Sequence, residues 1–66
     1  MKDSAIIRSF DSFLRSQYHV SAAGMHMDGD DVLNWAGHAK SANDVEEAVT
    51  EFAQYRGLSD TPALAA

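Results

Sequence analysis

Residues 4–18 read SAIIRSFDSFLRSQY, and this stretch decides the fold. Its large apolar side chains recur three or four positions apart, as on one face of an α-helix, and they are Ile6, Ile7, Phe10, Phe13, Leu14 and Tyr18. The opposite face is polar, and Asp11 stands four residues before Arg15, a spacing that favours a surface ion pair. We therefore predict a helix over 4–18, capped by Asp3 or Ser4, whose apolar face is buried in the core.

Beyond this helix the sequence predicts a loop over 19–30 and two more helices. The loop is indicated by two glycines and by alternating Met and His, which lack a helical period. Asp30 is a suitable N-cap for a second helix over 31–39, whose apolar positions are Val32, Leu33, Trp35, Ala36 and Ala39. We expect Trp35 to fill the gap between the first helix and a third helix over 44–56, with a role as an interface anchor as the alternative.

The start and the end of the third helix both carry capping residues. Ser41 and Asp44 form one capping pair at its start. Asn43 and Glu46 form a second pair that overlaps the first and is closer to a reciprocal capping box. Gly57 is expected to end the helix in the left-handed conformation. The predicted apolar side of this helix contains Val45, Ala48, Val49, Phe52, Ala53 and Tyr55.

The sequence thus predicts an all-α fold, a small three-helix domain over 1–58 followed by a disordered tail over 59–66. Chain length limits the core, because a domain of about 60 residues buries only roughly 60% of the surface that its unfolded chain exposes. The 66 residues include no Cys, so neither disulfides nor a thiolate zinc site can add stability. A partner, which includes the option of a second copy of the chain, is the remaining common source of stability.

Acidic residues are concentrated in one part of the chain. The whole chain has ten Asp and Glu against five Lys and Arg, a net charge of −5. From Asp28 to Glu51 there are seven acidic residues and one basic residue, Lys40, which gives a local net charge of −6. Helix N-termini favour negative charge and explain part of this excess. This effect accounts for Asp30, Asp31, Asp44, Glu46 and Glu47. The helix alone does not explain why Glu47 and Glu51, which repel each other, stand four residues apart on it.

This charge distribution predicts a partner-binding surface. We expect it to consist of Asp30, Asp31, Trp35, Glu46, Glu47, Glu51 and Tyr55. Its aromatic residues are of the type that anchors protein interfaces. Nonspecific binding to DNA or to an anionic membrane needs Lys and Arg to contact phosphate groups, so neither is expected of this chain. The predicted partner is a larger protein with a basic surface.

The sequence contains no motif for catalysis, cofactor binding or metal binding. His19, His26 and His38 lack the three- or four-residue spacing of a helical metal site. An EF-hand loop that began at Asp28 would place Val32 at position five, where an oxygen ligand is required. No Ser lies in a Gly-x-Ser-x-Gly turn, and the four Gly are isolated from one another. We therefore expect no enzyme activity, no catalytic residue, no cofactor and no metal.

The apolar runs of the chain are short. None reaches the ~7–15 residues of a signal-peptide core or the ~20 residues that cross a bilayer. The resulting expectation is a cytoplasmic protein.

Two families of small helical proteins share individual features with this chain. Acyl carrier proteins are also short, acidic and helical, but their modification sequence requires a Ser directly after an Asp, and here Asp30 is followed by Asp31. The second and third predicted helices are in the order of a helix-turn-helix DNA-binding unit. The third helix, however, carries three glutamates on its polar side and no Lys or Arg before Arg56, so its surface would repel DNA.

The leading functional hypothesis is a small acidic module that binds a basic surface on a larger, nucleic-acid-handling protein and inhibits it. Small inhibitors from phages and mobile elements, such as anti-CRISPR proteins, have this size and charge. Matched charges would let such a chain obstruct a nucleic-acid groove. The first alternative is a structural homodimer in which the first helix, or Trp35 with Tyr55, completes the core. The second alternative is a degenerate helix-turn-helix regulator.

Overall fold

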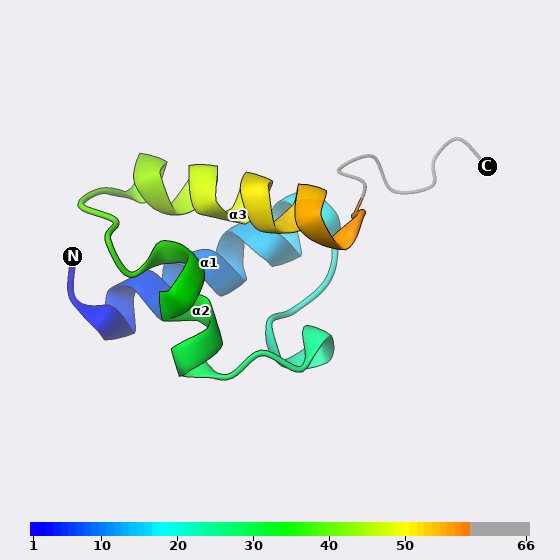
Figure 1. The fold of residues 1–66 in the computed structure, drawn as a ribbon, viewed down its shortest axis with the longest axis horizontal. Helices are drawn as coiled ribbons and strands as arrows, with labels where there is room; N and C mark the ends of the chain where they lie inside the picture. The colour runs from blue at the N-terminus through cyan, green and yellow to red at the C-terminus, as the bar shows by residue number, and fades with distance from the viewer. Residues whose placement is uncertain (59–66) are drawn as a thin grey trace.

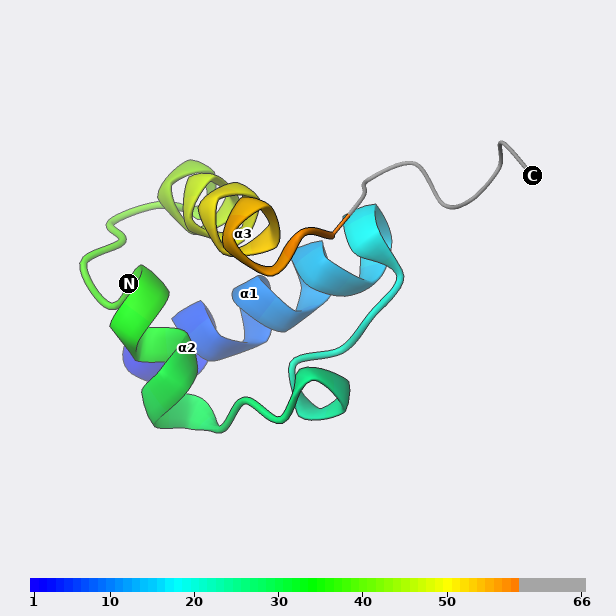
Figure 2. The same cartoon turned by 45° about the vertical axis from the view of Figure 1, so that its right-hand side comes forward.

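The structure, a computed structural model, describes residues 1–58. These residues form α1 (Asp3–Tyr18), the short 3₁₀ turn η1 (Ala23–Met25), α2 (Gly29–Ala36) and α3 (Ala42–Arg56). α1 and α3 run side by side in the same general direction, and α2 packs against both (Figures 1 and 2). The predicted all-α fold with three helices is confirmed. The tail predicted over 59–66 lies outside the described residues.

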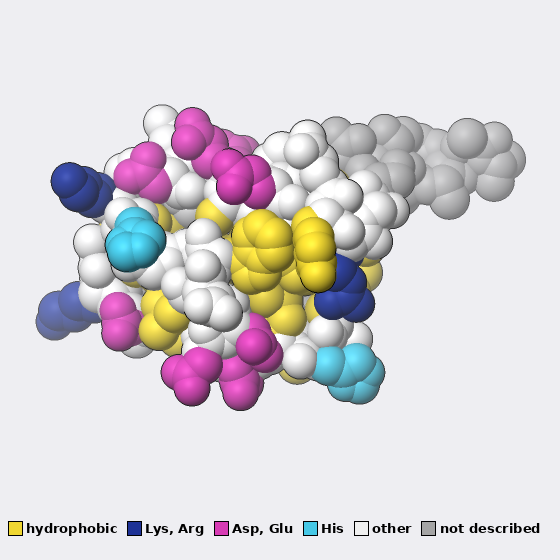
Figure 3. Space-filling model, in the orientation of Figure 1, with side chains coloured by type: hydrophobic (Ala, Val, Ile, Leu, Met, Phe, Trp, Pro, Cys, Tyr) yellow, Lys and Arg dark blue, Asp and Glu magenta, His cyan; other side chains and the backbone are white. Residues whose placement is uncertain are grey.

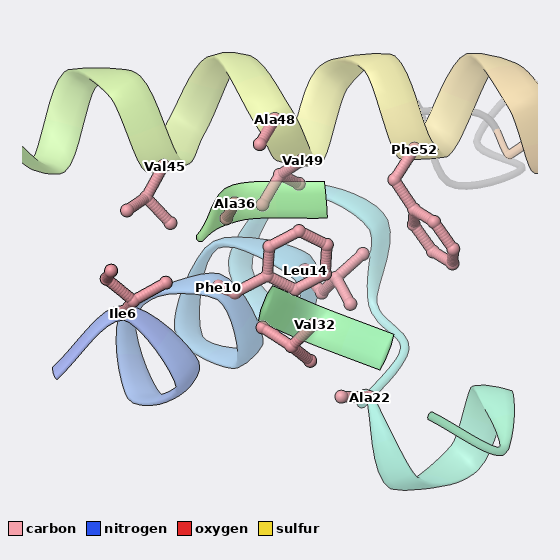
Figure 4. Close-up of a cluster of buried hydrophobic side chains, with 10 residues drawn as sticks. All are labelled: Ile6, Phe10, Leu14, Ala22, Val32, Ala36, Val45, Ala48, Val49 and Phe52. Carbon is pink, nitrogen blue, oxygen red and sulfur yellow. The ribbon is translucent and has the colours of Figure 1, made fainter. Parts of the chain in front are cut away.

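The core lies where the three helices meet, as Figure 4 shows. Its members come from all three helices and from the loop before η1: Ile6, Phe10, Leu14, Ala22, Val32, Ala36, Val45, Ala48, Val49 and Phe52. The rings of Phe10 and Phe52 meet edge to face with centroids 5.8 Å apart, a favoured geometry for an aromatic pair. The central residues of the α1 stripe are thus covered within a single chain, and they need no second copy to be buried.

The loop between α1 and α2 is held to α1 by one carboxylate. Asp11 Oδ1 accepts a hydrogen bond from the backbone N–H of Ala22 at 2.8 Å. Its Oδ2 accepts one from Arg15 Nε at 2.9 Å, which confirms the predicted ion pair. Ala22 is buried by this contact and joins the core from a loop position. The loop is therefore fixed beneath α1 although it has no helical period.

The start of α1 differs from the prediction. The helix begins at Asp3, one residue earlier than expected, and its N-cap residue is Lys2, which makes no side-chain capping bond. The prediction that Asp3 or Ser4 caps the helix is therefore wrong. Burial of the apolar stripe fixes the position of α1, so its start does not depend on a cap.

Both ends of α2 also differ from the prediction of 31–39. The N-cap is Asp28 and not Asp30. Asp28 Oδ1 accepts from the Asp31 backbone N–H at 3.0 Å, and Asp31 Oδ2 accepts from the Asp28 backbone N–H at 3.1 Å. This reciprocal capping box satisfies two backbone donors at once, whereas Asp30 as the cap would leave the Asp28 donor without its partner. The helix therefore begins at Gly29.

The C-terminal end of α2 is set by Gly37. Its backbone lies so close to the Leu33 carbonyl that an added Cβ would collide with that oxygen. The helix ends at Ala36, and the Ala39 N–H donates to the Ala36 carbonyl in a turn. A helix through Ala39, as predicted, would have to include the glycine, which is unfavourable in a helix interior. The early end leaves room for the turn that leads into α3.

The N-cap of α3 is Ser41, which overturns the preference for Asn43. Ser41 Oγ accepts from the Asp44 N–H at 3.4 Å, and Asp44 Oδ2 accepts from the Lys40 N–H at 2.9 Å. The helix therefore begins at Ala42, two residues before the predicted start. Its predicted end is confirmed, because Gly57 adopts a left-handed φ of 71°.

Candidate partner-binding face

α3 has a second ordered side, which lies next to α2 and faces solvent. Asp44, Glu47, Glu51 and Tyr55 recur along it three or four residues apart, so their side chains follow one line on the helix surface. All four are exposed. Together with Trp35 of α2 they form what we call the acidic aromatic face, defined as Trp35, Asp44, Glu47, Glu51 and Tyr55. Figure 3 looks onto this side of the molecule and shows exposed hydrophobic side chains between two groups of acidic side chains.

Aromatic rings connect this face to the core. The Trp35 ring lies edge to face against Phe52, with centroids 5.4 Å apart, and Phe52 in turn contacts Phe10. On its other side Trp35 lies 5.5 Å from the Tyr55 ring at an angle of 51°. Tyr55 is 75% exposed, so its predicted place on the apolar side of the third helix is wrong. Trp35, which was expected to fill the gap between the first and third helices, is half-buried against the core, and its ring contacts are to Phe52 and Tyr55 of α3.

A hollow of about 190 Å³ lies beside Trp35, between the end of α2 and the first half of α3. It is lined by Trp35, Ala36, His38, Ala39, Asp44, Glu47, Ala48 and Glu51. The three alanines have short side chains and leave the space open above the core. Among the described residues that line the hollow there are three carboxylates and no Lys or Arg. The hollow is therefore small, aromatic on one wall and strongly anionic.

The carboxylates of Glu47 and Glu51 have no cationic partner within the described part of the chain. In residues 1–58 the one ion pair joins Asp11 and Arg15, on α1. The two glutamates stand one helical turn apart, and like charges at this spacing repel each other. The structure thus places two unpaired carboxylates near the exposed ring of Tyr55 and the half-buried ring of Trp35, and the two carboxylates contribute nothing to the core.

The seven residues predicted for the partner-binding surface divide into two groups. Trp35, Glu47, Glu51 and Tyr55 lie together in the acidic aromatic face. Asp31 closes the capping box at the other end of α2, and Asp30 is exposed in the same first turn. Glu46 points to the opposite side of α3, where its Oε2 accepts from Gln17 Nε2 of α1 at 2.7 Å. It is half-buried there and links two helices.

Two polar residues of the hollow were missed by the sequence prediction. Asp44 was treated only as a capping residue, although its position three residues before Glu47 places both on one helix face. His38 follows the end of α2, and it reaches the hollow only because the helix stops at Ala36. Asp44 could have been found from the helical spacing of the acidic residues. His38 could not, because its position in the hollow depends on where the chain turns after α2.

No protein family, no curated protein and no solved structure matches this chain. Within residues 1–58, no three His, Asp or Glu side chains are grouped so that they could hold a metal ion. None of the helices in this part of the chain is long and apolar enough to cross a membrane. The functional assignment therefore depends on the acidic aromatic face itself.

Proposed function

We propose that this chain is a small acidic binding module, without catalytic activity, that inhibits a larger nucleic-acid-handling protein by occupying its basic surface. The observation that carries the proposal is the acidic aromatic face, in which the half-buried Trp35 and the exposed Tyr55 lie beside the unpaired carboxylates of Glu47 and Glu51. Its two aromatic residues are of the type that anchors protein interfaces.

The two kinds of side chain in this face have complementary effects on binding. Exposed Trp and Tyr side chains are the residues that most often supply the binding energy of an interface, because they bury large apolar areas on contact. Carboxylates around them attract a positively charged surface and raise the association rate. A partner that buried both would gain apolar contact and would also neutralise charges that repel each other in the free chain.

Inhibition of a nucleic-acid-handling protein follows from the charge of the expected partner surface. Proteins that bind DNA or RNA do so with Lys and Arg that contact phosphates. A chain with a net charge of −5 and an exposed acidic face competes for the same side chains. Small inhibitors made by phages and mobile elements, anti-CRISPR proteins among them, are the class of protein with which this proposal groups the chain.

The test compares two variants with the same change in charge. Glu47→Gln with Glu51→Gln removes two charges from the acidic aromatic face, and Asp3→Asn with Glu46→Gln removes two charges from other surfaces. Each variant and the wild-type chain are used to capture proteins from a lysate of the cells that make the chain, and captured proteins are identified by mass spectrometry. Each captured protein is then purified, and its binding to labelled DNA or RNA is measured with increasing amounts of the chain.

The proposal predicts a captured protein whose nucleic-acid binding is displaced by the wild-type chain and by the Asp3→Asn/Glu46→Gln control. The Glu47→Gln/Glu51→Gln variant should compete at least about tenfold more weakly at low salt, and the difference should shrink as salt screens the charges. Circular dichroism must show the same helix content for both variants. Equal competition by the two variants, or captured proteins whose nucleic-acid binding is unaffected, would overturn the proposal.

A further inference from the structure

The geometry of the hollow beside Trp35 points to the group that it takes, and we propose that this group is the guanidinium of an arginine side chain on the partner. The inference depends on the proposed function, because it names the chemistry of the basic surface that the acidic aromatic face would contact. It rests on three features of the hollow: its size, its charge and its aromatic wall.

The size of the hollow suits one side chain. Its volume of about 190 Å³ is below the roughly 300–1,000 Å³ of clefts that bind drug-sized ligands. Ala36, Ala39 and Ala48 line its base, and Ala36 and Ala48 are themselves buried, so the hollow ends on a packed core. An inserted group would contact Trp35 on one side and reach the carboxylates of α3 on the other.

The charge of the hollow requires a cation. Asp44, Glu47 and Glu51 are all part of its lining, and no Lys or Arg is among its described residues. Asp44 already accepts a hydrogen bond from the Lys40 backbone, which leaves its other oxygen open. A planar guanidinium has five N–H donors and binds carboxylates through two hydrogen bonds at once, whereas a lysine ammonium is a single point charge.

The aromatic wall favours arginine over lysine. Guanidinium groups are weakly hydrated and stack on aromatic faces, of which Trp gives the strongest attraction. The chain contains an example in the same ring cluster, because the Arg56 guanidinium carbon lies 5.8 Å from the centroid of the Phe52 ring. Phe52 directly contacts Trp35. The rings of this cluster thus already hold one guanidinium, and the hollow offers a second place with three carboxylates added.

The experiment uses two peptides of equal charge, acetyl-Gly-Arg-Gly-amide and acetyl-Gly-Lys-Gly-amide. Each is titrated into the full chain, and binding is followed by the NMR signal of the indole N–H, which is unambiguous because Trp35 is the one Trp of the sequence. The arginine peptide is expected to bind about two- to fivefold more tightly, because its planar guanidinium stacks on the indole and binds carboxylates through two hydrogen bonds, which a lysine ammonium cannot do. The signals of Ala36, Ala39 and Ala48 should shift with the same midpoint.

Two variants locate the binding. Glu47→Gln with Glu51→Gln should weaken binding of the arginine peptide at least about threefold, whereas Asp3→Asn with Glu46→Gln should leave it within error of wild type. Equal affinity for the two peptides, or shifts that avoid Trp35 and the three alanines, would overturn the arginine inference. Such a result would leave the proposed function standing if the captured partner still lost its binding to the Glu47→Gln/Glu51→Gln variant. Loss of the proposed function would instead show as equal competition by both charge variants in the nucleic-acid assay.

Discussion

Along α3, Val45, Val49 and Phe52 face the other helices and are at most 2% exposed, whereas Glu47, Glu51 and Tyr55 face solvent beside α2. The inner side is closed: within residues 1–58 no polar or charged side chain is buried, and no buried side-chain N or O lacks a hydrogen-bond partner. The outer side keeps an aromatic ring in water and two like charges one turn apart. One helix thus has a side that accounts for folding and a side that folding does not explain.

The outer side of α3 has features that neither stability nor solubility explains. A surface chosen for solubility alone would mix charges of both signs and would have few exposed aromatic rings. The outer side of α3 does neither, since Tyr55 is 75% exposed and Arg56 is the first basic residue of the helix. Substitutions on the two sides test this difference. Those on the inner side should lower stability, and those on the outer side should mainly weaken binding.

The largest effect is expected from Phe10→Ala, which removes the α1 ring that packs against Phe52 on the inner side of α3. Phe10 is fully buried and contacts Phe52 edge to face, and loss of such a ring costs about 3–5 kcal/mol through lost burial and a residual cavity. A domain of this size rarely has more than about 3–5 kcal/mol of stability, so the variant should be largely unfolded at 25 °C by circular dichroism.

A milder substitution at the same position lets the loss of stability be measured in a chain that still folds. Phe10→Leu preserves most of the volume and should cost less than about 1.5 kcal/mol if the core repacks, which urea denaturation can measure. Cooperative unfolding of Phe10→Ala near the wild-type midpoint would show that the inner side of α3 does not hold the fold.

A smaller effect is expected from Asp28→Ala, which removes the cap of α2. The substitution removes Asp28 Oδ1, the acceptor of the Asp31 N–H, and leaves the backbone N–H of residue 28 able to donate to Asp31 Oδ2. It should cost about 1 kcal/mol. Asp30→Ala is the matched control, because it removes the same charge one turn or less away without a capping bond, so it should cost only a few tenths of a kcal/mol. Equal losses in urea denaturation would show that Asp28 stabilises α2 no more than another first-turn carboxylate does. The result also concerns the outer side, since α2 positions Trp35 against α3.

These two predictions also show how far the sequence alone leads. α1 was predicted to within one residue because its apolar stripe is long and regular, and burial of that stripe overrides the missing cap. The start of α2 was misplaced because four residues, Asp28-Gly29-Asp30-Asp31, offer several caps, and its end was misplaced because the helix stops before Gly37. The choice between the caps depends on which side chains reach which backbone N–H groups.

The site was predicted in part for a similar reason. Helical spacing alone associates Glu47 with Glu51, and this pair does lie in the acidic aromatic face. Glu46 could not be separated from them by local pattern, because its partner Gln17 is 29 residues away on α1. The hollow was missed altogether. It exists because α2 ends early and because Ala36 of α2, Ala39 of the following turn and Ala48 of α3 line the same space, an arrangement that depends on how α2 packs against α3.

On the outer side, Tyr55→Ala is expected to change stability little. The ring is mostly exposed and its one aromatic neighbour is Trp35 among the described residues, so the cost should be about 0.5 kcal/mol, at the low end for an aromatic pair. Binding to the captured partner should fall much more, by tenfold or greater, if Tyr55 is an interface anchor. Tyr55→Phe keeps the ring and should retain most of the binding. A loss of stability comparable to that of Phe10→Ala would instead place Tyr55 in the core.

The smallest expected effects are changes in stability that differ in sign between two glutamates of α3. Glu51→Gln removes a like charge four residues from Glu47 and should stabilise the chain by about 0.2–0.5 kcal/mol at low salt. The same substitution at Glu46 weakens a charge-assisted hydrogen bond to Gln17 and should destabilise the chain. Urea midpoints at 10 mM and 1 M NaCl test both, and the gain at Glu51 should disappear at high salt. If Glu51→Gln were destabilising, its carboxylate would have a favourable role in the free chain. The repulsion along the outer side would then not be a feature that only a partner relieves.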